Sequence, residues 1–228
     1  MIKVKVCGIN NSENLKSLLT LPVDMVGFIF DDTSERNCTL SSEIVKEAFS
    51  KQNLTCKKVG IFVDAPLAEV LKKQEEYELD YVQLNGKENI FYCQLLREHQ
   101  LKLIKSFSVC NDFCYSNTSA YSFFCDYFVF ECQNTFGPKK ESQFNLNSLK
   151  NYKGKKPFFL SSEWGMNQIE SIRQMDFEYL NFINIIESFE IKPGHKNLDV
   201  VADFIYKIKR PESFNTRDNL DHRVSYGS

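Results

Sequence analysis

The residue of this chain best placed to do chemistry is Cys7, which stands at the carboxyl end of the run Ile2–Val6. That run alternates apolar and cationic side chains, a pattern typical of a strand. Gly8 and the polar cluster at 10–12 come next and can start a helix. A thiol at the end of an opening strand can serve as a proton-transfer group, provided that the rest of the chain builds a pocket over it.

The remainder of the chain alternates short apolar runs with longer amphipathic segments. We predict strands at 2–7, 24–30, 58–63, 81–84, 101–107, 127–130, 157–161 and 182–186. We predict helices at 13–19, 41–50, 67–78, 90–99, 116–122, 147–152, 166–175 and 198–209. Several strands are apolar on both faces, as parallel strands covered by helices are.

This alternation predicts an α/β fold, a single (β/α)8 TIM barrel with eight parallel strands. A doubly wound open sheet would usually carry a glycine-rich turn after its first strand, and no GxGxxG motif is present. We expect residues 1–210 to form the barrel and residues 211–228, which are polar, to be a disordered tail.

In such a barrel the functional groups lie just past the carboxyl ends of the strands. Those positions hold Cys7, 31–36, Asp64, Gln83, Asn85, Lys105, Ser106, Glu131, 161–164 and 186–188.

Composition and charge limit the kinds of partner and the cellular compartment that we expect for this protein. The 228 residues carry a net charge of −2, which indicates neither a nucleic-acid partner nor a membrane surface. No apolar run approaches the roughly 18 residues of a membrane span, and no secretory signal is visible, so we expect a cytoplasmic protein. The eight cysteines are scattered without a CxxC pair. They indicate reduced thiols, with no metal site and no cofactor.

Short motifs along the chain resemble the phosphoribosylanthranilate isomerase family, (β/α)8 enzymes of tryptophan biosynthesis. Each motif alone is weak, but together they fall in the family's order over residues 1–209. They are KVCGI (5–9), GFIF (27–30), Ser34-Glu35-Arg36, KVGIFV (58–63), LDYVQL (79–84), DYFVF (126–130), PFFLS (157–161) and Phe189-Glu190 ahead of Pro193-Gly194.

The resemblance implies an Amadori rearrangement of N-(5′-phosphoribosyl)anthranilate, in which a general acid opens the sugar ring and a general base removes the C2′ proton. Cys7 matches the base, since a thiol with an ordinary pKa of about 8.5 can exchange protons near neutral pH when its surroundings lower that value. Glu131 stands where the family has an aspartic general acid. Arg36 matches the residue that holds the anthranilate carboxylate. Further substrate contacts are assigned to Gln83, Ser161 and Ser162.

The chain departs from the family pattern where a phosphate would bind. Backbone N–H groups and glycines usually hold such a dianion, yet Gly137-Pro138-Lys139-Lys140 replaces a Gly-Gly-x-Gly run, and Ser161-Ser162-Glu163 replaces Ser-Gly-Gly. Asn184-Ile185-Ile186-Glu187 replaces an Asp-x-Asn-Ser segment, and Asn85 replaces a histidine. Like charges about 4 Å apart repel by roughly 4 kcal/mol at an effective dielectric near 20, so Glu163 and Glu187 oppose a phosphate.

Three functions remain open from the sequence. One is an active isomerase with altered phosphate-binding loops, working as a monomer or homodimer on a small phosphorylated substrate. Another is a diverged paralogue that has lost this activity and acts as a binding or regulatory protein. The third is an isomerase or lyase for an unphosphorylated or cationic ligand, with Cys7 and Glu131 as its proton-transfer pair.

Overall fold

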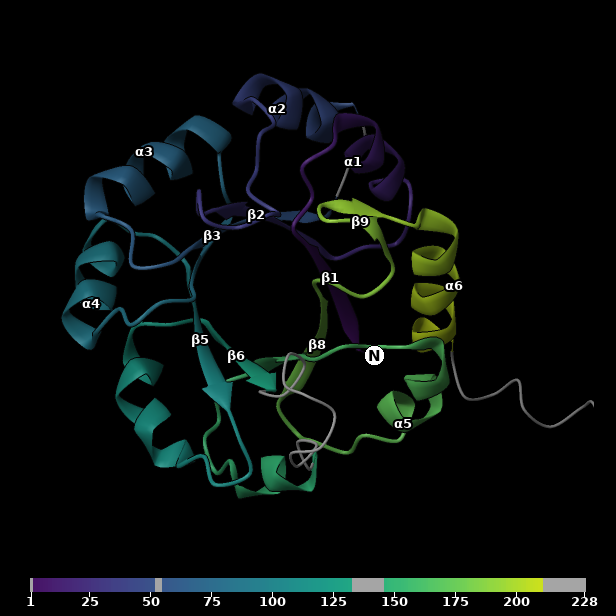
Figure 1. Ribbon diagram of the computed structural model, residues 1–228. Helices are drawn as coiled ribbons and strands as arrows, with labels where there is room; N and C mark the ends of the chain where they lie inside the picture. The colour runs from purple at the N-terminus through teal and green to yellow at the C-terminus, as the bar shows by residue number, and fades with distance from the viewer. Residues whose placement is uncertain (1, 52–54, 133–145, 211–228) are drawn as a thin grey trace, which may run out of the picture.

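Eight parallel strands close into a barrel in the computed structural model, which describes residues 2–51, 55–132 and 146–210. The strands pair in chain order from β1 to β8, and β8 returns to pair with β1. Figure 1 looks down the barrel, with the ring of strands in the centre and the helices around it. The predicted (β/α)8 TIM barrel is therefore confirmed.

The strands agree with the predicted ones to within about two residues at each end. They are β1 (Lys3–Cys7), β2 (Met25–Phe30), β3 (Lys57–Phe62), β4 (Tyr81–Leu84), β5 (Leu103–Val109), β6 (Tyr127–Cys132), β7 (Phe158–Ser161) and β8 (Leu180–Ile185). The α-helices of the described residues are α1 (Ser12–Leu18), α2 (Ser42–Ser50), α3 (Leu67–Tyr77), α4 (Ile90–Glu98), α5 (Ile169–Arg173) and α6 (Leu198–Lys209).

Polar caps fix where four of these helices begin. The side chains of Asn11, Ser41, Asn89 and Asn197 each accept a hydrogen bond from the backbone N–H three residues further on. Such a cap satisfies an N–H group that has no partner inside the helix. These caps therefore fix the residues at which the loops after β1, β2, β4 and β8 end and the helices begin.

Three of the predicted helices are wholly or partly 3-10 helices rather than α-helices. The segments 116–122 and 147–152 form 3-10 helices, η1 (Tyr115–Phe123) and η2 (Leu146–Asn151), and 166–175 divides into η3 (Met166–Gln168) and α5. In η1 the hydroxyls of Thr118, Ser119 and Ser122 donate to the carbonyls three residues back. Hydroxyl side chains that bond the local backbone compete with α-helical geometry.

A short antiparallel hairpin after β8 was not predicted. It consists of β9 (Glu190–Lys192) and β10 (His195–Lys196), and in Figure 1 β9 lies beside α1 near the carboxyl end of β2. The Asn14 amide of α1 holds the hairpin by exchanging two hydrogen bonds with the backbone of Lys196, at 2.9 and 3.0 Å. The hairpin therefore has a fixed place over the end of the barrel.

The core has an inner and an outer part, as the alternation of side chains along parallel strands requires. The inner part fills the barrel with Cys7, Met25, Val59, Ile61, Ile104, Val129, Phe159 and Phe182. The rings of Phe159 and Phe182 stack at 4.1 Å between centroids, and Tyr127 meets both of them edge-on. The filled interior leaves ligand chemistry to the mouth of the barrel.

Candidate active site

Cys7 reaches the barrel interior because β2 has a glycine beside it. Gly27 pairs with Cys7 across the two strands, and a Cβ on Gly27 would lie 2.6 Å from the Cys7 sulfur. The thiol is buried and donates to Asn184 Oδ1 at 3.2 Å. An amide oxygen accepts a hydrogen bond but does not take the proton, so Asn184 orients the thiol without deprotonating it.

A buried cation, Lys196, lies in the hairpin after β8. Its ammonium group donates to Glu190 Oε1 at 2.8 Å and to the Ile186 carbonyl. Burial lowers the pKa of Lys196 from its ordinary value, and the contact with Glu190 opposes that shift.

Glu131, at the end of β6, is held as a carboxyl group that resists ionisation. Its Oε1 atom accepts from Asn85 Nδ2 at 3.0 Å and from Ser106 Oγ at 3.2 Å. Burial raises the pKa of Glu131, and these hydrogen bonds together with the charges of Lys5 and Lys105 only partly offset that effect. A carboxyl group with a raised pKa keeps its proton to higher pH, as a general acid must.

Gln83 lies between a buried lysine and the partners of Glu131. Its Oε1 atom accepts from Lys5 Nζ, and its Nε2 atom donates to Asn85 Oδ1 at 2.7 Å and to Ser106 Oγ at 3.4 Å. Lys5 and Gln83 are almost fully buried. The chain of hydrogen bonds from β1 through β4 and β5 to β6 therefore fixes the carboxyl of Glu131.

Arg36 lies beside the carboxyl end of β1, with its Cδ atom 3.1 Å from where a Cβ on Gly8 would stand. Its Nε and Nη2 atoms donate to Glu190, at distances of 2.8–3.1 Å. Its Nη1 atom lies 3.3 Å from Glu187 Oε1. The predicted carboxylate-binding residue is therefore at the mouth of the barrel, and two carboxylates of the chain itself contact it.

In the segment after β7, several polar groups form hydrogen bonds to other groups of the chain. Ser161 is buried, and its hydroxyl accepts from Asn184 Nδ2 at 3.1 Å, while Ser162 is partly buried. The backbone N–H of Trp164 donates to Ser188 Oγ at 2.8 Å, and that of Gly165 donates to Gln168 Oε1 at 2.8 Å. The indole N–H of Trp164 donates to the Asn184 carbonyl at 3.0 Å, which ties this segment to β8.

The other predicted phosphate segment, 137–140, lies outside the described residues. The ammonium group of Lys105 is buried, and it donates to Glu88 at 3.0 Å and to the carbonyls of Leu84 and Gly86. That pairing makes Lys105 a structural residue. Within the described part of the chain, no group of three His, Cys, Asp or Glu residues is arranged to hold a metal ion.

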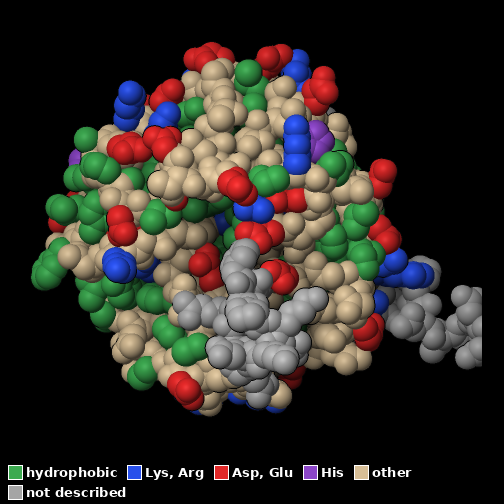
Figure 2. Space-filling model, viewed as in Figure 1, with side chains coloured by type: hydrophobic (Ala, Val, Ile, Leu, Met, Phe, Trp, Pro, Cys, Tyr) green, Lys and Arg blue, Asp and Glu red, His purple; other side chains and the backbone are tan. Residues whose placement is uncertain are grey.

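The mouth of the barrel carries many acidic side chains (Figure 2). In Figure 2 Asp and Glu side chains gather around the centre of the face, with cationic side chains between them. Burial raises the pKa of Glu187, the Arg36 charge lowers it, and the charges of Glu190 and Glu163 raise it further.

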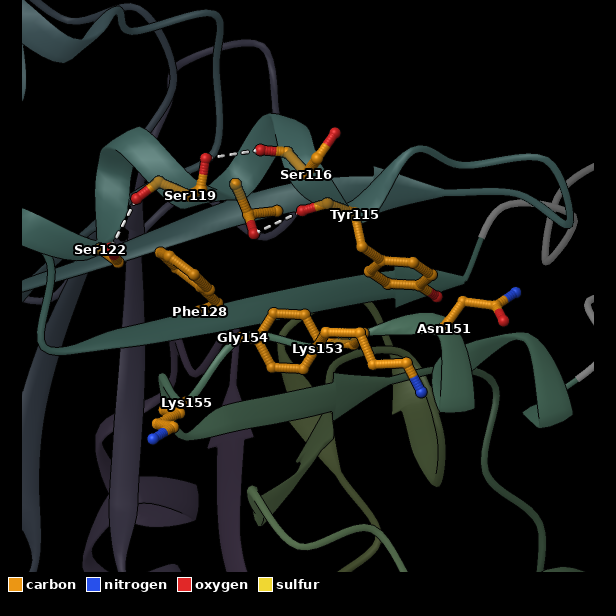
Figure 3. Close-up of a pocket in the computed structure, with 11 residues that line it drawn as sticks. Tyr115, Ser116, Ser119, Ser122, Phe128, Asn151, Lys153, Gly154 and Lys155 are labelled. Carbon is orange, nitrogen blue, oxygen red and sulfur yellow. Dashed lines mark hydrogen bonds between the residues drawn. The ribbon is translucent and has the colours of Figure 1, made fainter.

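A separate groove of about 360 Å³ lies on the outer wall of the barrel, between η1 and the segment 151–155 (Figure 3). None of the predicted site residues lines it. The hydroxyls of Thr118, Ser119 and Ser122 along it donate to their own helix backbone, which leaves them no proton for an anion.

Sequence reasoning missed three residues that the structure brings to the site: Asn184, Glu190 and Lys196. Asn184 is a polar residue within an apolar strand, and Glu190 belongs to a motif that carried the family resemblance. These two signals were available from the sequence. Nothing in the sequence indicated that Lys196 would be buried, because its burial depends on the unpredicted hairpin.

Comparison with known proteins agrees with this geometry. Residues 4–207 match the family model of N-(5′-phosphoribosyl)anthranilate isomerase. The isomerase of Parabacteroides distasonis is 33% identical over 213 residues, covering 91% of this chain and 94% of the relative. That of Phocaeicola vulgatus is 31% identical over 209 residues, covering 91% and 98%.

Among solved structures, the phosphoribosyl anthranilate isomerase of Thermotoga maritima is similar with a TM-score of 0.78. It is 25% identical, and the match covers 92% of this chain and 99% of the other. The match runs along the whole barrel in both sequence and structure. The chain therefore belongs to the N-(5′-phosphoribosyl)anthranilate isomerase family.

Proposed function

We propose that this protein catalyses the Amadori rearrangement of N-(5′-phosphoribosyl)anthranilate, a step of tryptophan biosynthesis. The observation that carries the proposal is a carboxyl group whose pKa is raised by burial, Glu131, at the same barrel mouth as a buried thiol oriented by Asn184, Cys7. The two residues end strands β6 and β1 of the same barrel mouth. Acid and base on one face are what the reaction needs.

In this mechanism Glu131 donates its proton to the ring oxygen of the sugar, and the ring opens. The Cys7 thiolate then removes the proton from C2′, and the resulting enolamine tautomerises to the ketone. Arg36 holds the anthranilate carboxylate, for which a guanidinium group has matching geometry. Gln83, Ser161 and Ser162 are proposed to complete the substrate site, Gln83 through its contacts with the partners of Glu131.

We also propose a cytoplasmic enzyme that acts as a monomer or homodimer without a nucleic-acid partner. The near balance of charges supports the absence of a nucleic-acid surface. No helix in the described residues is long and apolar enough to cross a membrane.

The test is turnover of freshly generated phosphoribosylanthranilate, followed by the loss of its fluorescence, with Cys7→Ala as the control. We expect turnover in the wild type and a fall of about 10²–10⁴-fold in kcat for the variant, the usual contribution of a general base. No turnover above that of Cys7→Ala, from protein shown to be folded, would refute the proposal. A binding or regulatory protein is the less favoured alternative, because acid, base and anchor are all present.

A further inference from the structure

The guanidinium group of Arg36 has one edge that is occupied by a carboxylate of the chain itself. Glu190 takes the Nε and Nη2 atoms, and its side chain is only 7% exposed. Lys196 Nζ and the backbone N–H of Gly194 also donate to Glu190, at 2.8 and 3.1 Å. With three partners and little solvent around it, Glu190 is a fixed support that aims Arg36.

The other edge of Arg36 is held much more loosely. Glu187 touches it through one contact, Oε1 to Nη1 at 3.3 Å, and the Glu187 side chain is 30% exposed. Glu187 stands between β8 and β9, outside both strands. The carboxylates of Glu190 and Glu163 act against its charge. A single, partly exposed ion pair of this kind is easily given up.

We propose that Glu187 is an internal competitor that occupies the position on Arg36 taken by the carboxylate of a bound aromatic acid, and that it must leave Arg36 when this ligand binds. The inference rests on the proposed function, in which Arg36 anchors the substrate's carboxylate. The Nη1 side is the edge of the guanidinium that Glu190 leaves open. Two carboxylates cannot share that edge without strong repulsion.

This arrangement makes Glu187 a specificity-determining residue. Giving up one partly exposed ion pair lowers the affinity for a carboxylate ligand by up to about fivefold. A ligand without a carboxylate has no group that can replace Glu187 on Arg36. Such a ligand would therefore have to bind through other contacts. The sequence difference is a single carboxylate where the family resemblance implies a serine.

The experiment measures anthranilate binding by isothermal titration calorimetry to wild type, Glu187→Gln and Glu187→Ser. We expect both variants to bind about fivefold more tightly than wild type. Glu163→Gln removes a charge from the same rim without a contact to Arg36, so its affinity should change less than twofold. Arg36→Met should abolish anthranilate binding, both in the wild type and when combined with a Glu187 substitution.

Equal or weaker anthranilate binding by both Glu187 variants, with melting curves like that of the wild type, would overturn the inference. Absence of binding in all variants would overturn it as well. Phosphoribosylanthranilate turnover separates the two proposals, because it can fail while the binding result still decides the role of Glu187. Where turnover is present, Glu187→Gln should lower KM about fivefold and leave kcat unchanged.

Discussion

At the residue scale, two departures from the family pattern lie in contact with each other. Glu131 is one methylene longer than the aspartate that the family resemblance implies, and Asn85 is shorter than the implied histidine. Asn85 Nδ2 donates to Glu131 Oε1 at 3.0 Å, so the longer acid meets the shorter donor. The pair keeps a hydrogen-bond donor on the carboxyl group of Glu131, the proposed general acid, and so fixes its position.

The proton of Glu131 sets one limb of the pH profile. Its pKa is raised, so the acid form persists to higher pH, and kcat should fall as the pH rises through that pKa. Glu131→Gln keeps the size and cannot donate a proton as an acid, so we expect kcat to drop about 10²–10⁴-fold. The descending limb should disappear in this variant. A kcat within twofold of wild type, with the limb unchanged, would show that Glu131 is not the acid.

The contact between Glu131 and Asn85 predicts coupling between the two positions. Glu131→Asp withdraws the carboxyl from Asn85 by a methylene, and a displacement of about 1 Å can cost up to about 100-fold in rate. Adding Asn85→His to that variant should recover part of the loss. The measurement is kcat/KM for both single variants and the double variant, analysed as a double-mutant cycle. Additive effects would mean that the two positions act independently.

At the element scale, the β9–β10 hairpin is the part that the barrel pattern does not require. It brings Glu190 into contact with Arg36, and Lys196 into contact with Glu190. Asn14 of α1 holds the hairpin against the barrel by a hydrogen bond to Lys196. Lys196 and Asn14 are buried, and the Glu190 side chain is only 7% exposed, so this part of the network is stable only while every partner is present. The hairpin thus supports Arg36, the proposed anchor for a carboxylate.

Removing the buried cation should destabilise the fold. Lys196→Met leaves the Glu190 carboxylate with one cationic partner fewer, and breaking a buried pair in this way costs about 3–5 kcal/mol in the free energy of unfolding. Urea denaturation measures the effect. Lys192→Met, an exposed residue of the same hairpin, is the matched control and should cost under about 0.5 kcal/mol. A similar loss in both variants would argue against the buried network.

At the scale of the whole molecule, the barrel is closed by pairing of β1 with β8 and completed by α6. Near the end of α6, Lys209 Nζ donates to Asp24 Oδ2 and to the Pro22 carbonyl, each at 2.6 Å. This contact joins the last helix to the loop before β2. The contacts that hold the barrel shut therefore reach as far as residue 209.

Truncation after Arg210 should leave the barrel intact. The predicted tail, 211–228, lies outside the described residues and begins beyond the Lys209 contact. We expect the melting temperature of the truncated chain to stay within about 2 °C of the full chain, which corresponds to well under 1 kcal/mol for a chain of this size. Truncation before Lys209 is the comparison and should lower the melting temperature further. Equal destabilisation by both truncations would give the tail a structural role.

The sequence by itself determined the barrel and the face on which its chemistry lies. Apolar runs and amphipathic segments alternate along the chain, and parallel strands all end on the same face. Cys7, Arg36 and Glu131 could therefore be assigned to one mouth from their places after strands. Helices were predicted at the three segments that form 3-10 helices, but their helix type was not, because short segments leave it to tertiary packing. In η1 the hydroxyl side chains also bond the local backbone.

Only the tertiary structure decided what these residues touch. Cys7 meets Asn184 from 177 positions away, and Arg36 meets Glu190 from 154 positions away. Burial likewise depends on everything packed around a group, and burial is what raises the pKa of Glu131. Local patterns set strands and helices, whereas contacts and solvent exclusion arise only when distant segments meet. That is why the sequence predicted only that Glu187 would oppose a phosphate, while the structure places it 3.3 Å from Nη1 of Arg36.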